Sequence, residues 1–178
     1  MGRVRGTWVV GAGALSLAAL GGASGCGAGE DPCGAVEPAA VEVGTGVTAF
    51  EAVGDDGIEV GKGNQGGYHL WVALRLRGFA PKAVAQIGAH DVDTGESLTY
   101  EEQRSVLQLE AGADGVAEIA GLRAVLTGDA LLDLAGRKIR VSATVEDSCP
   151  ATATGEVLTF ISDVPPEGGW PGEGGAGP

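Results

Sequence analysis

The sequence predicts an all-β domain, an antiparallel sandwich of about seven to nine strands. Glycine is very frequent, at 33 of 178 residues, whereas aromatic residues make up only 4%. This composition suits short strands joined by tight turns. Short apolar runs alternate with turn signals, and no long amphipathic helix interrupts them. The length allows one core once a targeting segment and a tail are removed, so we assign the domain to residues 39–163.

Two strands are predicted at the start of this domain. The apolar positions of the first are Val41, Val43, Val47 and Phe50, which alternate roughly with polar or small residues. The turn signal Asp55-Asp56-Gly57 then precedes Ile58-Glu59-Val60. We predict that these segments form a first pair of strands.

The clearest strand is Tyr68–Arg77, which lies between Gly66-Gly67 and Gly78. One face of this strand carries Tyr68, Leu70, Val72, Leu74 and Leu76, and the other carries His69, Trp71, Ala73, Arg75 and Arg77. We predict that the first face belongs to the core. The second face, with two arginines, is predicted to be at least partly wet.

The middle of the domain continues the pattern of apolar runs and turns. The predicted strands are Val84–Val92, a part of Ser97–Glu110, Val116–Ile119 and Leu122–Leu126. Asp93-Thr94-Gly95 and Ala113-Asp114-Gly115 are the turn signals between them. Residues 128–135 favour one or two turns of helix, because alanine and leucine predominate there.

A final hairpin is predicted from Arg137–Glu146 and Glu156–Ser162. The first of its strands alternates, with Ile139, Val141, Ala143 and Val145 expected to point inward. The turn Asp147–Ala151 places Cys149 at the tip of the hairpin. Residues 164–178 are Pro, Gly and Glu with one Trp, so we predict a disordered tail.

The N-terminus has the layout of an export signal over residues 1–25. Met1–Arg5 is short and basic, Gly6–Leu20 is apolar, and small residues lead into Cys26. An uncleaved membrane anchor is the alternative, although the richness in glycine and alanine argues against a permanent span. Residues 26–38 contain glycine, alanine, acids and proline without apolar periodicity, and they are interpreted as a tether.

The stretch Ala23-Ser24-Gly25-Cys26 resembles the lipobox of bacterial lipoproteins, with Ala23 where leucine is commonest. The resemblance implies that Cys26 becomes the first residue of the mature protein and carries acyl chains such as palmitate. Gly27 stands where an Asp would signal inner-membrane retention, so the resemblance implies the outer membrane. Small residues before Cys26 also suit ordinary cleavage, which would release a soluble secreted product.

The cysteine count bears on this choice. An exported chain with three cysteines leaves one odd thiol unless one of them is modified. Lipidation of Cys26 removes that oddness and leaves Cys33 and Cys149 as a pair. We predict a disulfide between them, since disulfides persist in oxidising compartments; two unpaired thiols are the alternative.

The chain resembles immunoglobulin-like and fibronectin-III-like domains at Gly66-Gly67-Tyr68-His69 with its long strand and at Gly136–Asp147. More narrowly, it resembles small lipoproteins of myxobacteria and their relatives. The resemblance covers roughly residues 39–163 and brings no catalytic signature. It implies a lipid-anchored envelope protein that binds another protein or the envelope, or has a structural role.

Several classes of chemistry find no support in the residues. The formal charge of −13 repels phosphate backbones, which argues against a nucleic-acid partner. Membrane contact is therefore expected through the N-terminal lipid. The two histidines, His69 and His90, lie in no catalytic motif, and no phosphate or dinucleotide fingerprint is present. We predict a non-enzymatic protein without a cofactor.

Two candidate binding regions remain. The turn His90–Glu96 brings Asp91, Asp93 and Glu96 close in sequence, and oxygen-rich turns can bind Ca²⁺. An ordinary exposed hairpin turn is the favoured interpretation of this segment, and Ca²⁺ or a small ligand is the alternative. The second region is the outer face of Tyr68–Arg77. Its predicted interaction residues are His69, Trp71, Arg75 and Arg77.

Overall fold

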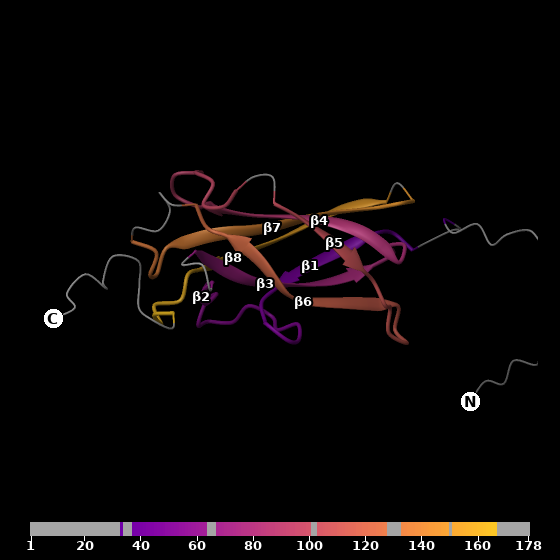
Figure 1. Ribbon diagram of the computed structural model, residues 1–178, viewed down its shortest axis with the longest axis horizontal. Coiled ribbons are helices and arrows are strands. Elements are labelled where there is room, and N and C mark those ends of the chain that lie inside the picture. The colour runs from indigo at the N-terminus through magenta and orange to yellow at the C-terminus, as the bar shows by residue number, and fades with distance from the viewer. Residues whose placement is uncertain are drawn as a thin grey trace, which may run out of the picture. The chain divides into compact units, whose positions relative to one another are not determined.

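The computed structural model describes residues 33, 37–63, 67–100, 103–127, 133–149 and 151–166. These residues belong to one compact unit, Pro32–Pro178. They contain eight strands, paired antiparallel in two four-stranded sheets, and no helix (Figure 1). The predicted all-β class is therefore confirmed. Within the described residues, no helix is long and apolar enough to cross a membrane.

The first sheet is built around β3 (Tyr68–Arg77), whose bounds match the predicted strand. One edge of β3 pairs with β6 (Val116–Val125). The other edge pairs with β1 (Ala40–Gly44) at one end and with β2 (Val60–Lys62) at the other. The prediction that the first two strands pair with each other is thus wrong. Both run antiparallel to β3 and therefore in the same direction, so they cannot form a hairpin.

The second sheet has the order β5-β4-β7-β8. Its strands are β4 (Lys82–Asp91), β5 (Arg104–Gln108), β7 (Lys138–Asp147) and β8 (Thr152–Phe160). Strand β8 begins at Thr152, earlier than the predicted Glu156. In the predicted segment Ser97–Glu110 only the second half forms a strand, while Ser97 and Thr99 make isolated bridges.

Strand β6 (Val116–Val125) is one continuous strand where the sequence predicts two, Val116–Ile119 and Leu122–Leu126. Its register against β3 shifts between Val72 and Leu74, which marks a bulge. Gly121 lies at this bulge with φ 71°, and its N–H donates to the carbonyl of Gly46 at 3.0 Å. A Cβ at Gly121 would lie 2.7 Å from the carbonyl oxygen of Val47, so glycine is required there.

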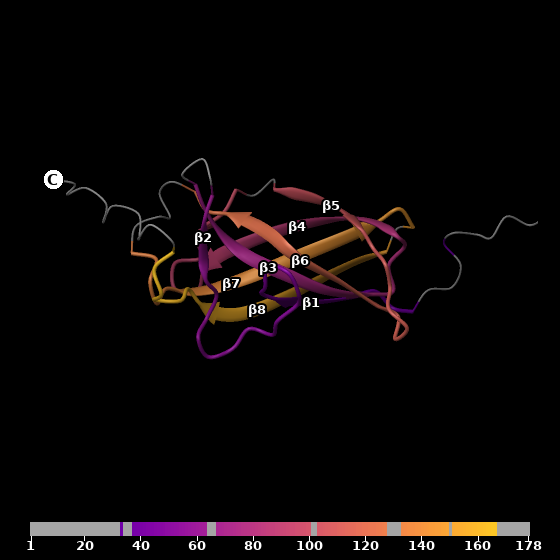
Figure 2. The same cartoon turned by 60° about the horizontal axis from the view of Figure 1, so that its bottom comes forward.

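The core lies between the two sheets, which form two layers (Figure 1 and Figure 2). Both predicted core faces are confirmed. The side chains at 0–1% exposure include Leu70, Val72, Leu74 and Leu76 of β3 and Ile139, Val141, Ala143 and Val145 of β7. Burying a valine, leucine or isoleucine fully contributes about 1.5–3 kcal/mol, so these two faces contribute strongly to the stability of the core.

The two sheets are also joined along their sides. Ile58 pairs in parallel with Ile161, and its N–H donates to the carbonyl of Phe160 at 2.9 Å. Strand β1 runs alongside β8, where a Cβ at Gly155 would lie 2.3 Å from the carbonyl oxygen of Val41 (Figure 2). On the opposite side, Thr99 bridges to Leu126 beyond the end of β6. These contacts connect the two sheets along both sides of the sandwich.

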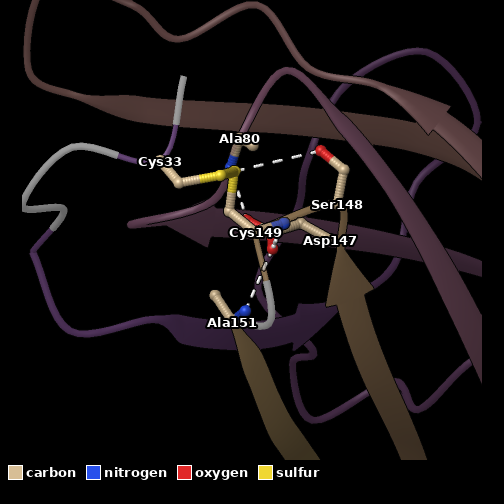
Figure 3. The surroundings of a disulfide bond; sticks show 6 residues. All are labelled: Cys33, Ala80, Asp147, Ser148, Cys149 and Ala151. Atoms are coloured by element: carbon tan, nitrogen blue, oxygen red, sulfur yellow. Dashed lines mark hydrogen bonds between the residues drawn. A yellow bond between two sulfur atoms is a disulfide. The ribbon is translucent and has the colours of Figure 1, made fainter. Parts of the chain in front are cut away.

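A disulfide joins Cys33 to Cys149, with the Cα atoms 5.2 Å apart across 116 positions (Figure 3). This is the pairing that was predicted from the cysteine count and the lipobox resemblance at Cys26, and Cys149 lies in the turn between β7 and β8 as expected. Beside it, the carboxylate of Asp147 accepts the N–H groups of Ala80, Cys149 and Ala151 at 2.7, 2.7 and 3.0 Å. The disulfide and this carboxylate together fasten three chain segments at one end of the domain.

Some predictions fall outside the described residues. They are the export signal over residues 1–25, the lipidation site Cys26, most of the tether 26–38, the greater part of the helical segment 128–135, and the tail beyond residue 166.

Candidate functional site

The outer face of β3 carries the predicted interaction residues, and the structure distinguishes among them. His69 is only 4% exposed, Trp71 and Arg75 are half-buried, and Arg77 is exposed. The face is therefore partly exposed to solvent, as predicted, but the exposed part does not include His69.

His69 and Trp71 form a compact aromatic pair. Their ring centroids lie 4.4 Å apart and the planes meet at 88°, an edge-to-face arrangement. Gly61 of β2 is the register partner of His69. A Cβ at Gly61 would lie 2.6 Å from Nε2 of His69 and 2.7 Å from Nε1 of Trp71. The two rings therefore occupy space that any other residue at position 61 would fill.

The Nε2 atom of His69 is buried and has no hydrogen-bond partner among the described residues. Burial lowers the pKa of His69, and the nearby positive charge of Arg123 lowers it further. The imidazole is thus neutral at pH 7. Leaving a buried polar group unpaired costs about 1–3 kcal/mol, and such atoms often mark a place where a ligand or water binds.

The cation beside Trp71 is Arg123 of β6. Trp71 and Arg123 are register partners, and the guanidinium carbon lies 5.2 Å from the centre of the indole. Gln103 holds this part of β6, because its side-chain amide donates to the carbonyl of Arg123 and accepts the N–H of Val125 at 2.8 Å. Gln103 thereby also satisfies backbone groups at the outer edge of the sheet.

Sequence reasoning missed Arg123 and expected Arg75 and Arg77 to accompany Trp71. Arg75 instead stacks over Phe50, 4.1 Å from the ring centre, and its Nε donates to Glu118 at 2.7 Å. The reason is geometric: cross-strand partners have Cβ atoms about 5 Å apart, closer than residues two apart along one strand. No local signal in the sequence identifies a cross-strand partner, since the register depends on the bulge at Gly121.

Two hollows meet at Trp71. The first, of about 590 Å³, is lined by Lys62, His69, Trp71 and Arg123 among others. Lys62 and Arg123 are exposed and form no ion pair with any carboxylate of the described residues. The second hollow, of about 890 Å³, is acidic. Its exposed carboxylates are Glu51, Asp55, Asp56, Glu59 and Asp163.

The turn after β4 has a different character. Oδ1 of Asp91 accepts the N–H groups of Asp93 and Thr94 at 2.8 and 2.7 Å, and Oδ2 accepts from Nε of Arg137. The Thr94 N–H first, and then Arg137, lower the pKa of Asp91 to about 2. Asp93 and Glu96 are exposed, and no three His, Cys, Asp or Glu side chains in the described ranges come together to hold a metal ion. The Ca²⁺ alternative therefore gains no geometric support.

Comparison with protein-family models, curated proteins and solved structures found no match.

Within the described part of the chain, no Ser, Thr or Cys side chain is hydrogen-bonded to either histidine. The features that converge around Trp71 are an aromatic surface, two cations that form an ion pair with no described carboxylate, and a neighbouring acidic hollow. These features suit recognition of a partner.

Proposed function

We propose that this chain is an exported lipoprotein of the bacterial outer membrane. Acyl chains on Cys26 anchor it, and its β domain binds another envelope protein through the outer face of β3. The role is non-enzymatic. The observation that carries this proposal is the disulfide between Cys33 and Cys149, which uses two of the three cysteines.

The disulfide supports both export and lipidation. Disulfides persist in oxidising compartments, which fits the export-signal layout of residues 1–25. Cys26 is then the one cysteine outside the pair, and it stands in the stretch that resembles a lipobox. Acylation of Cys26 would leave the mature protein without a free thiol.

The strand order supports an immunoglobulin-like or fibronectin-III-like fold. Taken as A, B and E, the strands β1, β3 and β6 have the order of one immunoglobulin sheet. Taken as C, F and G, the strands β4, β7 and β8 have the order of the other, with β5 in the place of an added strand C′. The disulfide departs from the family pattern, because Cys33 precedes β1 and Cys149 lies in a turn.

The surface around Trp71 supports a binding role. Tryptophan and arginine are the residue types that most often dominate the free energy of protein–protein binding. Trp71 is half-buried, which leaves part of its indole for a partner, and Arg123 stacks on that ring.

The anchor is tested by intact-mass analysis of the membrane-extracted protein, before and after reduction and thiol labelling. We expect acylated Cys26 as the first residue and two thiols that react only after reduction. An unacylated chain, or a thiol that reacts before reduction, would overturn the anchoring proposal.

The binding face is tested by capture of partners from envelope extracts with purified wild-type protein and with the variant Trp71→Ala. We expect the captured protein to be lost. The matched control is Leu158→Ala, an exposed apolar residue at 61% exposure on β8. Equal capture by a folded Trp71→Ala variant would refute the assignment of this face.

A further inference from the structure

We infer that the two hollows, which are both lined by Trp71, form one docking surface for a peptide segment of mixed charge, with a carboxylate at one end, a basic group at the other and an apolar residue between them. This inference rests on the proposed binding role of the same face and specifies the chemistry of the partner.

The cationic half of this surface is the hollow lined by Lys62 and Arg123. Each of these side chains carries a positive charge that no described carboxylate compensates, in a chain whose net charge is −13. His69 lines the same hollow, is 4% exposed, and has an Nε2 atom that no described residue satisfies. A carboxylate in this hollow supplies the counter-charge that Lys62 and Arg123 lack, and it accepts a hydrogen bond from Nε2 of His69 in the tautomer that carries its proton on that atom.

The acidic half is the second hollow, which Trp71 also lines. Its carboxylates come from separate segments, since Glu51 follows β1, Asp55 and Asp56 precede β2, and Asp163 follows β8. The described residues around this hollow include no Lys or Arg. A basic side chain of the partner is therefore its complement.

The pairing of the two halves defines the class of partner. A polyanion such as nucleic acid would meet Lys62 and Arg123 but also the surrounding negative charge, so its binding would be opposed over most of its length. A polycation would be attracted to the acidic hollow but repelled by the positive charge of Arg123. A segment whose own charge changes sign satisfies both hollows, and an apolar residue at its centre covers the exposed part of Trp71.

The test uses labelled seven-residue peptides, blocked at both ends, and the full-length protein in detergent micelles. Two probes carry two glutamates, a central leucine between glycines, and two lysines, in either order. Two further probes replace all charged residues by glutamate or all by lysine. Binding is measured by fluorescence anisotropy at low and at 0.5 M salt, because added salt screens exposed charges.

We expect one mixed-charge order to bind about tenfold more tightly than either uniform peptide, and to weaken about tenfold in the double variant Lys62→Gln/Arg123→Gln. The matched control is Arg104→Gln/Lys138→Gln, which removes the same charge from exposed positions on the other sheet. That control should leave the affinity unchanged.

The inference is overturned if a uniform peptide binds as tightly as both mixed ones, if no peptide binds at millimolar concentration, or if the control variant loses as much affinity. Its failure is separable from failure of the proposed function. If partner capture still requires Trp71 but no mixed-charge peptide binds, only this inference is refuted. If partner capture does not depend on Trp71, the proposed binding face itself is refuted.

Discussion

Arg137 and Asp91, 46 positions apart in sequence, are joined by a hydrogen bond from Nε to Oδ2, which connects the residue just before β7 to the end of β4. The other oxygen of Asp91 accepts two backbone N–H groups of the turn that follows. Because Asp91 is only 6% exposed, its charge is stabilised by these partners and has little contact with solvent.

This arrangement predicts a pH dependence of stability. The folded-state pKa of Asp91 is about 2, below the usual 3.8, so its contribution is present above 3.8 and is lost as pH falls through about 2. We expect the difference in unfolding free energy between wild type and Asp91→Asn to be constant above pH 5 and to shrink between pH 4 and 2. Urea denaturation at a series of pH values measures it. Asp93→Asn, at an exposed position, is the control, and a difference that grows on acidification would contradict the prediction.

The disulfide is expected to contribute strongly to stability. Closing a loop of 116 positions contributes about 4–5 kcal/mol in the chain-entropy account. Cys33→Ser with Cys149→Ser should therefore lower Tm markedly in thermal unfolding followed by circular dichroism. Cys26→Ser should leave Tm near that of wild type. An unchanged Tm in the double variant would contradict this prediction, because it would show that the disulfide does not stabilise the folded state relative to the unfolded state.

Asp147 and the disulfide should be coupled. Replacing Asp147 by Ala leaves the N–H groups of Ala80, Cys149 and Ala151 without their acceptor, and we expect a loss of about 2 kcal/mol. Because Cys149 belongs to both features, the loss should differ when the disulfide is already absent. A double-mutant cycle in urea tests this, and strictly additive losses would disprove the coupling.

Gly61 should be intolerant of a side chain. The Cβ of Gly61→Ala would lie 2.6 Å from His69 Nε2 and 2.7 Å from Trp71 Nε1, so the rings must move. We expect a loss of about 1–3 kcal/mol together with a change in tryptophan fluorescence. Gly54→Ala, where nothing lies within 4 Å of the new Cβ, is the control and should behave like wild type. Equal stability of the two variants would argue against tight packing at Gly61.

The local features of this protein were accessible from its sequence. The alternation in Tyr68–Arg77 predicted both the bounds of β3 and its buried face, and the same reasoning identified the inward residues of β7. Period-2 alternation is a property of each strand by itself, because successive side chains point to opposite faces. The cysteine count, together with the lipobox resemblance at Cys26, predicted the pair Cys33 and Cys149 without any knowledge of distance.

Partnership between strands was decided only by the tertiary structure. Nothing in β1 or β2 indicates that both pair with β3, and nothing near Trp71 indicates that Arg123 lies opposite it. Pairing and register depend on how distant segments share one core, and here on a single bulge at Gly121. The sequence alone therefore determined the all-β class, the bounds of β3 and the inner faces of β3 and β7, whereas the assembled sheets determined which charges surround Trp71, since those charges come from segments that meet only in the fold.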